Sequence, residues 1–336
     1  MQSVSVGFPV RTSRHASVVR RIAAALVLVS GSLFLLTGCD SETLDTSTSD
    51  QQARALAALG SETSVLAYAD VHSLLNESGP FIELLPDEAR TAFRTSLTES
   101  AASMGLNPYE DVHGVYFAVA DAASGGLAAS DIAAVFFIDL ADVPLPPELE
   151  DATKRTIAGH DVYESGPTGA GSMFLARYND EAIVLSTSDA WMERALESMD
   201  LKNTTAAFPD ILTEVSSSDA WIVVSDVDML MHDAPADLGQ YSAIVNQVAR
   251  AAAGVVLQDG VFDIRMLAEP SEATTSEDLA SVARAAKALL RMQNDVPDYV
   301  LTLSERITVE ERRDRVLLSM RIDVELAQTL MEKFGG

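Results

Sequence analysis

The sequence predicts an α+β protein made of two tandem similar domains, each a mostly antiparallel sheet with helices packed on one face, akin to a split β-α-β arrangement. Three observations support this class. Short apolar runs follow one another in pairs across short polar turns, which favours antiparallel pairing. Longer amphipathic stretches separate these pairs. The same order of elements occurs twice in 336 residues, a length that allows two hydrophobic cores.

The amino terminus has the pattern of a signal peptide. Residues 1–21 contain four arginines and no acid, residues 22–36 are almost wholly apolar, and small residues then lead to Cys39. The apolar run is shorter than the roughly 20 residues that a spanning helix needs, so a permanent transmembrane helix is the weaker alternative. Residues 1–38 are therefore expected to be removed.

Leu36-Thr37-Gly38-Cys39 closely resembles the lipobox of bacterial lipoproteins. The resemblance implies that Cys39 becomes the first mature residue and carries acyl chains, of which two or three anchor a protein stably. It also implies a location at the cell membrane, on the extracytoplasmic side, either periplasmic or on the surface. A buried thiol is the alternative for Cys39, the one cysteine of the chain. The order of repeats behind the lipobox is similar to that of uncharacterised tandem-repeat envelope lipoproteins.

The expected mature chain is strongly acidic. Without residues 1–38 it has 19 basic and 50 acidic residues, a formal net charge of −31. Such a surface repels phosphate backbones, which excludes nucleic acid as a partner. Residues 39–52 are polar and lack periodicity, so they are expected to form a flexible tether that begins at the lipidated Cys39.

The first domain is expected over residues 53–205, after a short helix at 53–59. A strand at 64–70 is rich in apolar and aromatic residues and ends at Asp70. Apolar residues then recur every three or four positions, which predicts a helix over 86–104. The remaining elements follow from the same two periodicities: strands at 112–120 and 132–140, a helix near 146–155, strands at 161–165, 172–178 and 182–187, and a helix at 189–199.

The second domain is expected over residues 206–336. It opens with a strand at 220–226 and a helix at about 240–250. A helix over 275–292 is predicted to start with a capping box formed by Thr274 and Glu277. The other expected elements are strands at 252–258, 261–268, 305–311 and 314–321, and a helix at 323–334.

Two local alignments favour an internal duplication. Residues 65–74 match residues 221–230, which places Asp70 over Asp226. Residues 180–185 match residues 314–319, which places Asp189 over Asp323 at the start of the following helices. Both of these aspartates are expected to be helix caps.

The other motifs favour structural roles over chemistry. The glycine-rich stretch at 166–173 lacks the lysine of a phosphate-binding loop and precedes a strand, so it predicts a hairpin connection. The histidines of the mature chain show no metal-ligand spacing, and no metal or cofactor is expected. Trp191 and Trp221 are expected to be core contacts. The histidines of the expected mature chain, which are interpreted as surface or turn residues, are His72, His113, His160 and His232.

No catalytic set is recognisable, so the leading hypothesis is not an enzyme. We expect a lipid-anchored envelope protein with a binding or scaffolding role, whose partner is another envelope protein or a small apolar molecule held between sheet and helices. The alternative is an envelope hydrolase that uses acidic residues near the Asp70 and Asp226 turns.

Overall fold

The structure is a computed structural model of the chain. It describes residues 46–60, 63–83, 87, 90–92, 94–95, 106–120, 131–141, 143, 149, 152–165, 172–199, 208–225, 227, 246–292 and 298–334. Cys39, the expected signal peptide and Asp226 lie outside these residues.

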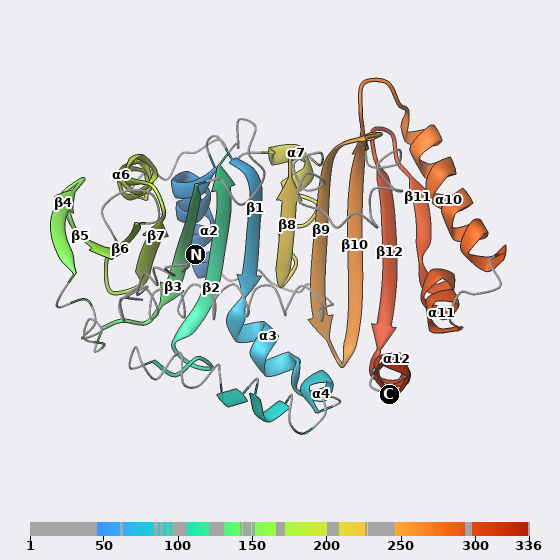
Figure 1. Cartoon of the computed structure of the whole chain (residues 1–336), viewed down its shortest axis with the longest axis horizontal. Coiled ribbons are helices and arrows are strands. Elements are labelled where there is room, and N and C mark those ends of the chain that lie inside the picture. The colour runs from blue at the N-terminus through green and yellow to red at the C-terminus, as the bar shows by residue number, and fades with distance from the viewer. Residues whose placement is uncertain are drawn as a thin grey trace, which may run out of the picture.

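A 12-stranded antiparallel sheet forms the centre of the protein (Figure 1). The strands are ordered β11-β12-β10-β9-β8-β1-β2-β3-β7-β6-β5-β4. Together with the helices that flank it, this sheet confirms the predicted α+β class. The strand bounds are β1 Thr63–Asp70, β2 Val112–Ala120, β3 Ile132–Ile138, β4 Thr153–Ile157, β5 His160–Ser165, β6 Met173–Arg177, β7 Ala182–Ser186, β8 Ala220–Val224, β9 Val248–Gln258, β10 Val261–Pro270, β11 Thr308–Glu311 and β12 Val316–Asp323.

One face of the sheet carries the main hydrophobic core. Leu66, Ala118 and Ala133 lie side by side on three neighbouring strands and are fully buried. The cluster continues to Leu317 near the far edge, so one core spans the sheet. The helices that contribute to it are α2 Thr46–Leu59, α6 Asp189–Ser198 and α7 Pro209–Leu212.

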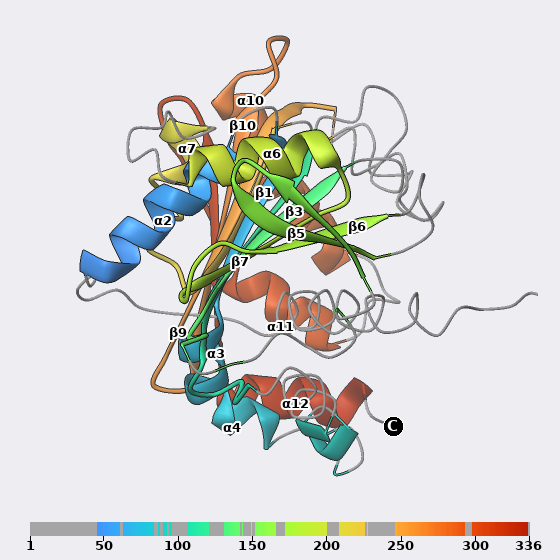
Figure 2. The ribbon, with the colours of Figure 1, turned by 90° about the vertical axis from the view of Figure 1, so that its left-hand side faces the viewer.

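Other helices pack on the opposite face. Val316 and Leu318 alternate with Leu317 along β12, and they pack against Leu279 and Ala280. Figure 2 shows the sheet nearly edge-on, with α2 and α11 on different sides. The helices are thus not confined to one face of the sheet. The remaining helices are α3 Val71–Glu77, α4 Gly79–Ile82, α10 Ser276–Met292, α11 Asp298–Arg306 and α12 Val324–Phe334.

Strands from the two expected domains pair directly at the middle of the sheet. β1 and β8 are antiparallel neighbours, with Tyr68 opposite Trp221 and Val65 opposite Val224. Two separate tandem sheets are therefore not confirmed. The expected alignment placed Val65 over Trp221, but these side chains lie on opposite faces of the sheet. The predicted boundary at residue 205 lies outside the described residues.

Several local predictions differ from the structure. The helix expected near 146–155 is contradicted at its end, where strand β4 begins at Thr153. The helix expected at 240–250 is contradicted at its end by strand β9, which begins at Val248, and α11 was not predicted. Helix α2 begins at Thr46, so residues 46–52 of the expected tether are helical. The cap of α10 is formed by Thr275 and Asp278, one residue later than predicted.

Candidate functional site

The end of β1 and the start of β8 bring two acidic residues together. The backbone amide of Asp70 donates to the carbonyl oxygen of Asp219 at 2.6 Å. Asp70 also caps α3, because its Oδ1 accepts the backbone N–H of Ser73 at 2.8 Å. The alternative function, an envelope hydrolase, also involves the turn at Asp226. Asp226 is not among the described residues, so the hydrolase alternative stays a prediction.

Among the described residues, Asp219 is the one whose carboxyl pKa is shifted towards neutral pH. Burial raises the pKa of Asp219 to about 6, and the negative charges of Asp70 and Glu77 contribute in the same direction. A hydrogen bond from the backbone N–H of Leu257 to Asp219 Oδ2 opposes this shift. The carboxylate thus connects the start of β8 to β9 and exchanges its proton near neutral pH. The sequence analysis did not identify Asp219.

Three aromatic side chains lie next to one another on the neighbouring strands β8, β1 and β2, close to this acidic pair. The ring centroids of Tyr68 and Tyr116 are 4.4 Å apart, and those of Tyr68 and Trp221 are 5.9 Å apart. Gly114 makes room for Tyr68, because a Cβ atom there would lie 3.1 Å from its ring. Burial raises the pKa of Tyr68 far above its ordinary range. The cluster is a packed part of the hydrophobic core.

Both tryptophans are core residues, as predicted. Trp191 is 1% exposed and Trp221 is fully buried. The indole Nε1 atoms of both have no hydrogen-bond partner in the described part of the chain. Their large apolar surfaces account for their burial.

Two histidines meet where α3 leaves β1 and β2 begins. The rings of His72 and His113 have centroids 6.5 Å apart and planes inclined by 46°. His72 Nδ1 lies 3.0 Å from the carbonyl oxygen of Tyr109. Both residues are exposed. The sequence showed no metal-ligand spacing among the histidines, and sequence spacing does not reveal contacts between residues that are distant in the chain.

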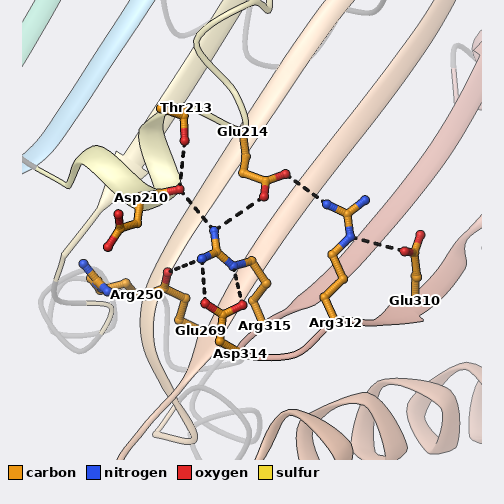
Figure 3. A network of polar contacts seen from close by, with 9 residues as sticks. All are labelled: Asp210, Thr213, Glu214, Arg250, Glu269, Glu310, Arg312, Asp314 and Arg315. Carbon is orange, nitrogen blue, oxygen red and sulfur yellow. Dashed lines mark hydrogen bonds and ion pairs between the residues drawn. The ribbon is translucent and has the colours of Figure 1, made fainter.

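A polar network ties the segment before β8 to the second half of the sheet (Figure 3). The guanidinium of Arg315 contacts Glu269 at 3.7 Å and Glu214 at 3.8 Å, and donates to the carbonyl oxygen of Asp210 at 3.2 Å. Glu269 and Arg315 are almost completely buried, whereas Arg312, which binds Glu214 at 2.9 Å, is partly exposed. Glu214, Glu269, Arg312 and Arg315 each have an oppositely charged partner among the described residues, and Glu269 also pairs with Arg250 at 2.5 Å. The network therefore fits a structural role better than a binding site.

The other predicted positions give mixed outcomes. Asp323 caps α12 as expected, since its Oδ1 accepts the N–H of Leu326 at 2.8 Å. Asp189 does not: Ser188 is the N-cap of α6, and Asp189 pairs with Arg155. Within the described ranges, no three or more histidine, cysteine or acidic residues form a metal-binding group. No helix in that part of the chain is long and apolar enough to cross a membrane.

Comparisons with known proteins find similarity in structure alone. No protein-family model matches the sequence, and no curated protein matches it. Solved structures of TP0453 in crystal forms I, III and IV are similar to the chain, with 10%, 11% and 11% identity and TM-scores of 0.43, 0.46 and 0.43. The matches cover 83%, 83% and 82% of this chain and 96%, 98% and 96% of the other. A resemblance this distant identifies no function.

Proposed function

We propose that the protein is a lipid-anchored cell-envelope protein on the extracytoplasmic side of the membrane, with a binding role and no enzymatic activity. The observation that carries this proposal is the order of the amino terminus: a basic segment, an apolar run, the Leu36-Thr37-Gly38-Cys39 motif and a polar segment. Acyl chains on Cys39 would hold the folded part next to the bilayer.

The anchor is tested by changing Cys39 to Ser in the full-length chain. We expect cells that express this variant to incorporate no labelled palmitate into the protein, while the unchanged chain is labelled and remains with the membranes. Labelling of the Cys39→Ser variant would overturn the anchor. Cytosolic recovery of the unchanged chain with residues 1–38 intact would do the same.

A row of apolar side chains supports an apolar partner. Ile222, Ala253, Met266 and Leu318 lie opposite one another on four neighbouring strands, on the face turned away from α2, and Leu318 forms the end of the row that packs against α10. Met266 is 38% exposed and the other three are partly buried. Four strands span roughly 15 Å at the usual strand spacing. A single row of four side chains has a much smaller area than the roughly 800 Å² per partner of a stable protein interface. A small apolar molecule is therefore the partner that fits it better.

Nile red, a neutral apolar dye, can report on this strip. We expect saturable fluorescence enhancement with the full-length chain and a clear loss of affinity in Met266→Glu. The matched control is Met292→Glu, at a residue of α10 that is 77% exposed, which should bind the dye as the unchanged chain does. Equal dye binding by both variants would reject the strip as the site, and crosslinking in cells would then test for a protein partner.

A further inference from the structure

The pair His72 and His113 is created by the fold. Asp70 and Gly114 are opposite each other in the β1–β2 pair, and the two histidines lie close to them in sequence. On the other side of β2, Val112 pairs with Ile138 and Gly114 with Phe137, so His113 is the extra residue of a β-bulge. A bulge redirects the side chain of its extra residue. Here that side chain meets the first turn of α3.

The hydrogen bond of His72 leaves one ring nitrogen available. The carbonyl oxygen of Tyr109 can only accept, so Nδ1 of His72 carries the hydrogen. In the neutral ring Nε2 then presents a lone pair. Histidines that bind metals commonly donate their other N–H to a backbone carbonyl, which fixes the ring and its tautomer. His72 therefore has the arrangement of a metal ligand before any metal is bound.

The rings are close enough for a shared ion. Two imidazoles bound to one tetrahedral ion with Zn–N distances of about 2.1 Å have centroids roughly 5 Å apart. The observed separation is 6.5 Å. Exposed side chains change rotamer on a picosecond to nanosecond timescale, so a closure of this size is within their ordinary motion. Among the described residues the His113 ring has no hydrogen bond that would hold it back.

We propose that His72 and His113 form a two-histidine site for a divalent transition-metal ion, with Cu²⁺ or Zn²⁺ as its occupant and water as the remaining ligands. Imidazole nitrogen suits these ions, and divalent affinity generally rises to a maximum at Cu²⁺. The strongly negative chain raises the concentration of cations near the surface. This site is independent of the proposed anchor and of the apolar strip.

The site is tested by adding Cu²⁺ to the full-length chain in the presence of excess Mg²⁺. Mg²⁺ prefers oxygen ligands and occupies the many carboxylates, while it competes poorly for imidazole. We expect one bound Cu²⁺ whose electron paramagnetic resonance spectrum shows coupling to two nitrogens. His72→Gln and His113→Gln should each weaken binding by about tenfold or more, as losses in metal sites commonly do.

A matched control separates this site from general histidine binding. His160 lies on β5 and stacks on Tyr178 at 5.0 Å, and His160→Gln should bind Cu²⁺ with unchanged affinity. The proposal is overturned by a spectrum with oxygen ligands alone, by equal affinity of the unchanged chain and the His72→Gln/His113→Gln double variant, or by an equal loss in His160→Gln. A spectrum of the unchanged chain that shows fewer than two coupled nitrogens overturns the proposal even where a variant fails to fold.

Discussion

Replacing Asp219 by Asn should make the protein more stable at neutral pH. The carboxyl of Asp219 is half-buried near Asp70 and Glu77, so its charged form is disfavoured in the folded state. Asn keeps an oxygen that can accept the N–H of Leu257 and carries no charge. The substitution therefore removes an unfavourable charge while it preserves the link between β8 and β9.

The size of the effect follows from the pKa. The pKa of Asp219 rises from 3.8 to about 6 on folding. Each pKa unit corresponds to about 1.4 kcal/mol, and partial exposure of the carboxyl reduces the sum to about 1–2 kcal/mol. Because the folded state binds more protons than the unfolded state between these two pH values, this group's contribution to stability falls as pH rises through the window. The variant should match the unchanged protein near pH 4 and exceed it at pH 7.

Denaturant unfolding of both proteins across this pH range measures the difference directly. We expect the free energy of unfolding of Asp219→Asn minus that of the unchanged chain to grow with pH and level off above the raised pKa. A difference that stays constant from pH 4 to 7 would refute the assignment of the raised pKa to Asp219. A difference that falls with pH would mean that its charged form is stabilised by the fold.

Three further substitutions test the packing and the polar network. Gly254→Ala should destabilise the protein by about 1–3 kcal/mol in denaturant unfolding, because the added Cβ would lie 2.6 Å from the hydroxyl of Ser218; an unchanged midpoint would contradict that contact. Arg315→Ala should cost about 1–3 kcal/mol, because it removes a buried guanidinium that donates to the carbonyl oxygen of Asp210 and contacts Glu269, which keeps Arg250 as its other partner at 2.5 Å; Arg312→Ala at the exposed end should cost less than about 1 kcal/mol in the same assay. Asp323→Asn should cost about 1 kcal/mol at pH 7; the hydrogen bond from Arg306 lowers the Asp323 pKa, so the cost should shrink as acid protonates the unchanged chain, and a larger cost in acid would contradict this.

The strand pattern could be predicted well from the sequence where turns are local. Asp259 and Gly260 have positive φ values of 52° and 70°, as the two-residue turn between β9 and β10 requires, and both strands were expected on either side of it. The helix expected at 146–155 was less reliable, since its sequence gave no strong periodicity. There Thr153 begins an edge strand, which pairs on one side only and needs little apolar alternation.

The pairing of the two halves could not be predicted from the sequence. Nothing in the local pattern of β1 or β8 specifies its neighbour, because both are buried strands that any apolar strand can pair with. The repeat alignment matched apolar residue to apolar residue, and in strands buried on both faces such a match survives a shift of one residue. That shift moves every side chain to the other face, as it does for Val65 and Trp221.

The histidine pair shows the same limit at the level of a site. His72 and His113 are separated by a long stretch of chain, and each alone is an ordinary exposed histidine. Their proximity depends on the pairing of Asp70 with Gly114 and on a bulge of one residue, and neither feature has a sequence signature. Removal of the bulge by deletion of His113 would also change the register of β2. Substitution by Gln, which keeps the bulge, is therefore the change that separates metal binding from folding.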